Sequence, residues 1–163
     1  MERKLASKFY INSLEEDIYQ NREKTLLLVL DEQPKLMKTM ENGEKTITNT
    51  LTLLKAFKEY DMNYLATEQY PKGLGRSDDR LLELIEEDKI FAKSLFDAAI
   101  PEVVDFIEKK DIKKVLVVGA EGHVCIYQTV RSLLDMGLEV FLVEDAVSSF
   151  TEDLKKTALS SIG

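Results

Sequence analysis

The sequence predicts a three-layer α/β/α fold, doubly wound around a mostly parallel sheet. Two continuous apolar runs indicate it, TLLLVL at Thr25–Leu30 and VLVV at Val115–Val118. Such runs suit strands that are buried on both faces, as parallel sheets require. Segments of strand character alternate with amphipathic helical segments along the chain, and this alternation is typical of a parallel sheet with right-handed crossovers.

Strands and helices are expected to alternate after a polar N-terminal extension at residues 1–24. The predicted strands, marked by short apolar runs, are 25–30, 62–66, 89–93, 115–118 and 139–144. The predicted helices, marked by helical apolar spacing or by capping residues, are 44–60, 78–88, 96–110, 123–136 and a last one near 151. We find no internal repeat and no flexible linker, so residues 1–163 are expected to form one domain.

Composition and charge exclude several classes of function. The net charge of -8 and the pI near 4.8 oppose a broad electrostatic affinity for nucleic acid or for an anionic membrane. No apolar run approaches the ~20 residues that a membrane-spanning helix needs. The start of the chain lacks the apolar core of a signal peptide, so a cytoplasmic protein is expected. One cysteine excludes an intrachain disulfide, and with a single histidine it cannot build a Cys/His zinc cluster, so no metal or other cofactor is expected.

The single cysteine is expected in the first turn of a helix. The strand 115–118 leads into a turn at Gly119–Gly122, and helical spacing begins at His123, so Cys125 lies close to the helix N-terminus. A helix N-terminus carries about +0.5 of an elementary charge and unpaired N–H groups. It lowers the pKa of a thiol and can bind an oxyanion. A lone cysteine is more often a small buried apolar residue, so the rest of the chain has to support a nucleophile.

Two charged residues are expected at the same edge of the sheet as Cys125. Asp31 follows the strand 25–30 directly, and Lys93 stands at the end of the strand 89–93. The carboxyl ends of the strands in an open α/β sheet meet at the ligand-binding crevice. Taken singly, Asp31 is more often a turn or capping residue, and Lys93 a solvated surface charge. An acid, a cation and a thiol that converge there form a candidate acyl-transfer site.

The segment Thr67–Gly75 is expected to be a loop beside this edge. Glu68 is a candidate ligand-binding carboxylate, although a solvated loop acid is the more frequent case. The two glycines and Lys72 do not make a P-loop, because the GKS/T ending is missing. Aromatic and apolar residues that are candidates for a pocket wall are Tyr70, Leu74, Phe96 and Phe150.

Four segments together resemble a known family. They are LLLVLDEQ at 26–33, TEQYPKGLG at 67–75, KSLFDA at 93–98 and VVGAEGHVCIYQTVRSLLDMGLEVFLVEDAVSS at 117–149. The chain resembles the isochorismatase-like cysteine hydrolases, and most closely their isochorismatase domain-containing branch. The resemblance implies an isochorismatase-like fold and a homo-oligomer that acts on a small-molecule substrate.

The resemblance also implies roles for individual residues. Asp31, Lys93 and Cys125 would form a catalytic triad in which Cys125 attacks a carbonyl, Asp31 moves protons and Lys93 holds the charges. The backbone N–H groups of Glu121 and Cys125 would form the oxyanion hole, next to a non-proline cis peptide between Ala120 and Glu121. Glycine at 119 and 122 suits so strained a turn. The expected substrate-binding residues are Gln33, Glu68, Tyr70, Phe96 and His123.

Departures from the family narrow the expected activity. Metal-dependent nicotinamidases of this fold have an aspartate and two histidines where this chain has Thr67–Tyr70, so nicotinamidase activity is not expected. True isochorismatases lack the cysteine nucleophile, so hydrolysis of isochorismate is not expected either. His123 is expected to cap the turn, with a Cys–His dyad as the alternative. Family members usually continue into a further strand and helix, which are expected to be missing here, and the strand 139–144 would then have an unpaired edge. Either the sequence is a fragment, or a partner subunit or the N-terminal segment covers that edge.

The leading hypothesis is a cysteine hydrolase that cleaves an amide or related C–N or acyl bond of a small molecule through a thioester intermediate. The alternative is a non-catalytic, oligomeric interaction module with the same fold. A redox-sensing thiol is a third option, although the chain has no second cysteine to resolve an oxidised one.

Overall fold

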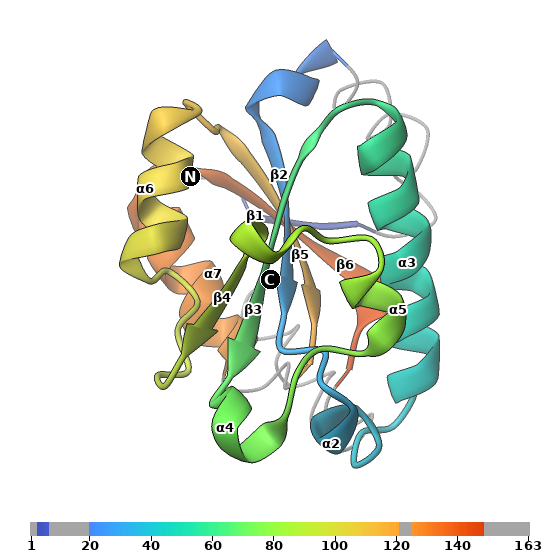
Figure 1. The fold of residues 1–163 in the computed structure, drawn as a ribbon. Coiled ribbons are helices and arrows are strands. Elements are labelled where there is room, and N and C mark those ends of the chain that lie inside the picture. Colours follow the sequence, from blue (N-terminus) through green and yellow to red (C-terminus); the bar gives the residue numbers. More distant parts are fainter. Residues whose placement is uncertain (1–2, 7–19, 121–124, 149–163) are drawn as a thin grey trace.

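The computed structural model describes residues 3–6, 20–120 and 125–148 (Figure 1). In these residues one sheet has six strands in the order β1-β6-β5-β2-β3-β4, and every strand pair is parallel. The strands are β1 (Arg3–Ala6), β2 (Thr25–Leu30), β3 (Asn63–Gln69), β4 (Ile90–Lys93), β5 (Lys114–Gly119) and β6 (Glu139–Val147). The predicted α/β fold with a mostly parallel sheet is confirmed.

Helices cover both faces of the sheet. The helical segments are η1 (Arg22–Lys24), α2 (Pro34–Met37), α3 (Gly43–Glu59), α4 (Pro71–Leu74), α5 (Asp79–Leu82), η2 (Glu87–Lys89), α6 (Pro101–Lys109) and α7 (Cys125–Asp135). Figure 1 shows α3 and α5 on one side of the strands and α6 and α7 on the other. This arrangement gives the three layers that the sequence predicts. No helix in the described part of the chain is long and apolar enough to cross a bilayer.

The central strand β2 explains why apolar runs mark this fold. Successive side chains of a strand point to opposite faces, so a strand between two helical layers has to be apolar throughout. Leu26, Leu28 and Leu30 belong to the apolar core that includes residues of α6 and α7. Leu27 and Val29 belong to the core on the α3 side. Burial of β2 on both faces therefore places its carboxyl end in the middle of the molecule.

The N-terminal segment contributes an edge strand that the sequence pattern did not predict. β1 runs parallel to β6, with Arg3 opposite Val140 and Ala6 opposite Val143. Of the two ways considered to cover the edge of β6, the structure has the N-terminal segment. The segment RKLA has no continuous apolar run, and only its pairing with β6 makes it a strand.

Three element boundaries were predicted wrongly. β3 continues to Gln69, so Thr67–Gln69 is strand rather than loop and pairs with β4. The helix predicted over 78–88 is only α5, and the carbonyl of Leu84 beyond it accepts a hydrogen bond from Lys58 Nζ. The helix predicted from residue 96 begins at Pro101, where the fixed φ of proline suits the first helical position. The helix expected near 151 lies outside the described residues.

Candidate active site

A buried ion pair lies at the carboxyl ends of β2 and β4. Lys93 Nζ is 2.9 Å from Asp31 Oδ2, and each side chain is only 1% exposed. These two strands flank β3, so the pair reaches across the end of that strand. Asp31 has a φ of 56°, in the left-handed region that non-glycine residues rarely adopt. Backbone strain of this kind is found where the surrounding structure has to hold a side chain in one place.

Both carboxylate oxygens of Asp31 have a polar neighbour. Thr67 Oγ1 donates a hydrogen bond of 2.8 Å to Oδ1, while Oδ2 faces the ammonium of Lys93. Thr67 is itself buried and lies on β3, directly between the two strands of the pair. A buried carboxylate needs such compensation, because removal from water strongly disfavours the charged form.

Lys93 has more acceptors around it than it has N–H groups. Nζ donates to Gln69 Oε1 at 2.5 Å, to the Leu95 carbonyl at 3.0 Å and to the Phe96 carbonyl at 3.2 Å, while its contact with Asp31 Oδ2 is an ion pair without a hydrogen bond. An ammonium group has three N–H donors, so the three acceptors occupy all of them. In this arrangement Lys93 has no N–H left to donate to a substrate.

Gln33, predicted to bind substrate, joins two segments of the chain. Its Oε1 accepts from the Gln69 N–H at 2.7 Å, and its Nε2 donates to the carbonyls of Gln69 and Gly75 at 2.8 and 2.7 Å. The side chain is fully buried. These bonds use both amide N–H groups of Gln33, so the residue fixes the end of β3 and the segment that follows it.

Glu68, the second predicted substrate ligand, is also bound within the protein. Its Oε2 accepts from the backbone N–H of Ser77 at 2.7 Å and from Ser77 Oγ at 2.8 Å. Arg76 Nε lies 3.0 Å from the other carboxylate oxygen, Oε1. Glu68 is only 3% exposed. Its bonds to Arg76 and Ser77 hold the segment that follows α4 in place.

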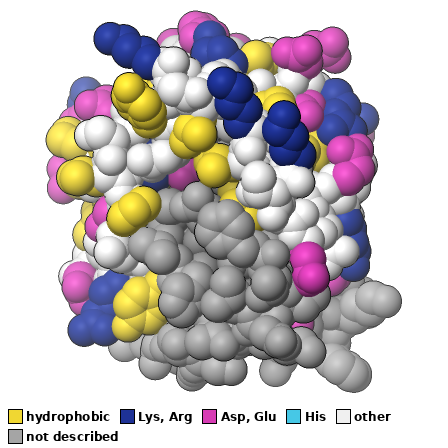
Figure 2. All heavy atoms as spheres, turned by 90° about the horizontal axis from the view of Figure 1, so that it is seen from below, with side chains coloured by type: hydrophobic (Ala, Val, Ile, Leu, Met, Phe, Trp, Pro, Cys, Tyr) yellow, Lys and Arg dark blue, Asp and Glu magenta, His cyan; other side chains and the backbone are white. Residues whose placement is uncertain are grey.

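Tyr70 and Phe96 lie at the surface around the ion pair. They are 58% and 49% exposed, and Leu95 beside Phe96 is 70% exposed. The backbone N–H of Tyr70 donates to the Lys93 carbonyl at 2.8 Å, and this bond joins the residue after β3 to the end of β4. Figure 2 views the molecule from this end and shows hydrophobic side chains gathered beside the atoms drawn in grey. The exposed aromatic and aliphatic side chains form an apolar surface near the ion pair.

Glu32 is a buried acid that the sequence analysis did not single out. Thr50 Oγ1 donates to its Oε2 at 2.6 Å, and its Oε1 has no hydrogen-bond partner among the described residues. Burial raises the pKa of Glu32 to about 8, against the lowering effect of the Thr50 bond, and the carboxylates of Asp78 and Asp31 raise it further. Glu32 is therefore mostly protonated at neutral pH. The polar sequence around Glu32, Asp31-Glu32-Gln33, does not indicate that this acid is buried.

The end of β5 brings the chain to Asp31 and then to α7. The Ala120 N–H donates to the Leu30 carbonyl at 2.9 Å, so the turn after β5 begins beside Asp31. Gly119 has a φ of +132°, and a Cβ added there would lie 2.1 Å from the Leu30 carbonyl oxygen. Only glycine permits this approach. The turn leads to α7, whose first residue is Cys125.

Several predicted site features lie outside the described residues. They are Glu121, the expected cis peptide between Ala120 and Glu121, His123, Phe150 and the side chain of Cys125. The described residues contain no group of three or more His, Cys, Asp and Glu side chains that could hold a metal ion.

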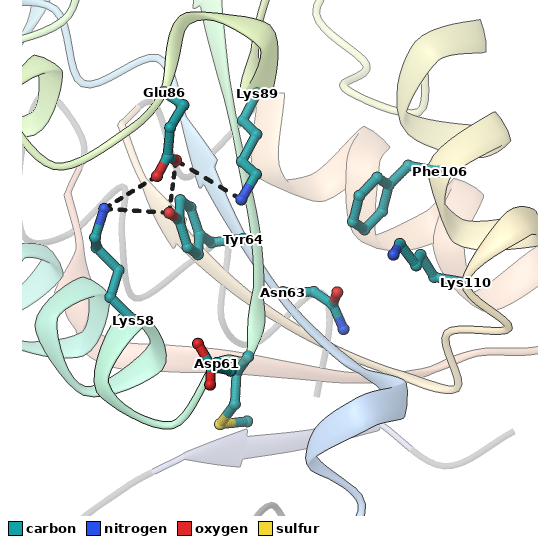
Figure 3. A pocket seen from close by; sticks show the side chains of 9 residues that line it. Lys58, Asp61, Asn63, Tyr64, Glu86, Lys89, Phe106 and Lys110 are labelled. Atoms are coloured by element: carbon teal, nitrogen blue, oxygen red, sulfur yellow. Dashed lines mark hydrogen bonds and ion pairs between the residues drawn. The ribbon is translucent and has the colours of Figure 1, made fainter.

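A hollow of about 430 Å³ lies at the opposite end of the sheet, before β3 and β4 begin (Figure 3). Its polar groups bind one another. The Tyr64 hydroxyl donates to Glu86 at 2.6 Å, Lys58 lies 3.2 Å from Glu86, and Lys89 Nζ lies 4.3 Å from the centre of the Tyr64 ring. Ligands of open α/β sheets bind at the carboxyl ends of the strands. We therefore place the candidate site at the Asp31–Lys93 pair rather than in this hollow.

Comparison with known proteins identifies related sequences. The family model described as the isochorismatase domain matches residues 25–163. Isochorismatase family protein 1A of Dictyostelium discoideum is 33% identical over 140 residues, which cover 83% of this chain and 68% of the relative. Isochorismatase domain-containing protein 2 of Xenopus laevis is 33% identical over 138 residues, which cover 83% of this chain and 66% of the relative. The chain spans about two thirds of the length of these relatives.

Solved structures show the same fold. The structure of MAR1 ribonuclease from Caenorhabditis elegans has a TM-score of 0.82 at 35% identity, and the match covers 86% of this chain and 73% of that one. The Escherichia coli YcaC gene product, described as an octameric hydrolase of unknown specificity, has a TM-score of 0.80 at 20% identity. That match covers 86% of this chain and 72% of that one. At 20% identity the second likeness concerns the fold alone.

Proposed function

The chain belongs to the isochorismatase family and has its hydrolase fold, and on this premise we propose that it is a cysteine hydrolase. It cleaves an amide or related acyl bond of a small molecule. The observation that carries the proposal is the Asp31–Lys93 ion pair, buried at the carboxyl ends of the strands. The adjacent strand β5 leads into the helix that begins at Cys125.

Each residue of the triad has one role in this reaction. Asp31 takes the proton of the Cys125 thiol, and the thiolate attacks the substrate carbonyl carbon. A C–S bond forms while the carbonyl π electrons move to oxygen, which accepts hydrogen bonds from the backbone N–H groups of Glu121 and Cys125. The C–N bond then breaks, and Asp31 gives its proton to the leaving amine. Water attacks the thioester, with Asp31 again accepting a proton, and the thiol is restored as the acid product leaves.

Lys93 serves this reaction as a charge and not as a proton carrier. Its three N–H groups donate to Gln69 and to the two carbonyls that follow β4, and its charge lies beside the Asp31 carboxylate. The fixed ammonium holds the Asp31 carboxylate in one orientation and favours a negative charge on sulfur nearby.

The first test is the rate at which iodoacetamide alkylates Cys125 as a function of pH. We expect fast alkylation with an apparent thiol pKa below ~8.5 and a higher pKa after Lys93→Ala. Asp31→Ala should also change the pH profile, because it removes a neighbouring negative charge and the proposed base. Lys109→Ala is the matched control, because that lysine is exposed and pairs with Asp105 on the surface. A slow reaction with an ordinary pKa, insensitive to both changes, would favour the non-catalytic interaction module.

The second test is turnover. A library of small amides is screened with the wild type, and Cys125→Ala is compared on each compound that the wild type hydrolyses. We expect the variant to lose turnover while its circular dichroism spectrum stays unchanged. Hydrolysis that continues at the wild-type rate in Cys125→Ala would end the proposal.

Ribonuclease activity is a second candidate, because a protein described as MAR1 ribonuclease is 35% identical to this chain. The net charge of -8 opposes it, since RNA binding depends on the neutralisation of phosphates by cationic side chains. We expect no cleavage of labelled RNA at low salt. Cleavage by the wild type that Asp31→Asn abolishes would replace the amidase proposal with this one.

A further inference from the structure

The segment between β4 and α6, residues 94–100, forms part of the surroundings of Lys93. The carbonyls of Leu95 and Phe96 accept two of the hydrogen bonds from Lys93 Nζ. The side chains of these two residues are largely exposed, so they contribute little packing that would hold the backbone in place. The position of the ammonium therefore depends on whatever fixes this connecting segment.

Helix α7 fixes the connecting segment through two side chains. Thr129 Oγ1 accepts the N–H of Ala98 at 2.8 Å, and both residues are fully buried. Ser132 Oγ donates to Asp97 Oδ2, while Asp97 Oδ1 accepts the N–H of Ala99 at 2.8 Å. The methyl group of Ala98 lies in the apolar core. Without Thr129, the N–H of Ala98 would be a buried donor with no partner, which is costly.

The two contacts lie in line with the first residue of the helix. Positions 125, 129 and 132 are spaced i, i+4 and i+7 along α7. Residues at this spacing share one face of a helix, each about one turn from the next. The face of α7 that holds the connecting segment is therefore the face on which position 125 stands, at the N-terminal end.

We propose that Thr129 and Ser132 are positioning residues, which set the distance between the Lys93 ammonium and the N-terminus of α7. The inference rests on the proposed function, in which Lys93 influences the thiol of Cys125. The connection runs from Lys93 through the carbonyls of residues 95 and 96 to Asp97 and Ala98, and from there to α7. Each step is a hydrogen bond or a short piece of backbone, so a shift of the segment along the helix moves the cation relative to position 125.

The test removes these contacts without a large change in shape. In the variant Thr129→Val/Ser132→Ala, we expect the alkylation rate of Cys125 at pH 7 to fall about tenfold, since small misplacements of catalytic groups have effects of this order. The apparent thiol pKa should rise, as it does in Lys93→Ala. Thr129→Ser keeps the hydroxyl and should restore the wild-type pH profile. Hydrogen exchange at the Ala98 amide should quicken in the double variant.

Ile85→Val is the control for a loss of stability alone. Ile85 is buried in the core on the α3 side of the sheet, and its truncation lowers the melting temperature without touching the connecting segment. A double variant that melts lower but keeps the wild-type pH profile, as Ile85→Val should, would overturn the inference and leave the proposed function intact. Should the double variant not fold, Ser132→Ala alone gives the same comparison, because Ser132 is only half-buried. If wild-type Cys125 itself reacts slowly and independently of Lys93, the inference and the proposed function fail together.

Discussion

Asp31 and Lys93 are so deeply buried that each depends on the other for its charge. Lys93→Met leaves the Asp31 carboxylate without its cation, and we expect a loss of about 3–5 kcal/mol in the free energy of unfolding. The double variant Asp31→Asn/Lys93→Met has no buried charge at this place and should recover most of that loss. Urea denaturation of the four proteins in the cycle measures the coupling. Additive losses would show that the ion pair contributes no interaction of its own.

Glu32 makes the stability of the fold depend on pH. Its pKa is about 8 in the folded protein, against an ordinary value of 4.5. The folded state therefore holds a proton that the unfolded state releases between these values, and stability falls as the pH rises from 4.5 to about 8. Glu32→Gln removes this loss. At roughly 1.36 kcal/mol per pKa unit, we expect the variant to be more stable than the wild type by about 3 kcal/mol at pH 7.

Urea denaturation at pH 5, 7 and 9 tests this prediction for the wild type and for Glu32→Gln. The gain in stability should be small at pH 5 and should reach its full size near pH 8. Glu59→Gln is the control, because Glu59 is exposed on the last turn of α3. An equal gain at all three pH values would mean that Glu32 is ionised throughout.

The two charged residues of the site were predictable because they stand where strands end, and apolar runs mark those ends in the sequence. The roles of Gln33 and Glu68 were not predictable in this way. Both were expected to bind substrate, which stays a prediction, and both are bound to backbone groups of the protein in this structure. A sequence shows that a polar side chain lies near a site, but its partners come from loops that only the fold brings close.

Among the elements, the turn after β5 has the strictest requirement. Gly119→Ala introduces a Cβ that would collide with the Leu30 carbonyl oxygen, at a φ that is itself unfavourable for alanine. Strain alone costs about 1–3 kcal/mol, and the collision adds to it. Gly75→Ala is the matched control, because Gly75 also has a positive φ but an added Cβ there would have no atom within 4 Å. Thermal unfolding should show a larger loss for Gly119→Ala, and equal losses would contradict the role of the close approach.

The elements that could be predicted are those whose stability comes from apolar burial. The runs of β2 and β5 and the helical spacing of α3 identified these elements to within one or two residues. Thr67–Gln69 contains no such run and becomes strand because β4 pairs with it and because Thr67 and Gln69 bind the ion pair. The local sequence pattern carries no information about these distant partners, so it predicted a loop for this stretch.

At the scale of the whole molecule, β1 determines whether the sheet has an open edge at β6. Deletion of residues 1–6 removes this strand and leaves the backbone groups of β6 unpaired on one side. We expect the shortened chain to unfold at a lower temperature and to form larger assemblies than the full chain at the same concentration. Light scattering of both chains measures this, and the full chain in the same experiment tests the expected homo-oligomer. A deletion variant with the mass and stability of the full chain would contradict the role of β1.

The pairing of β1 with β6 also has a consequence for the order of events on the ribosome. Among the strands of the described sheet, β1 leaves the exit tunnel first and β6 last, and the two lie side by side. β2 to β5 can assemble while synthesis continues, because their partners are already present. β1 has to wait, unpaired, until β6 has emerged, and its docking closes the longest loop in the sheet. Of the strands in the described sheet, β1 is therefore the one that nascent-chain factors can reach for the longest time before it pairs.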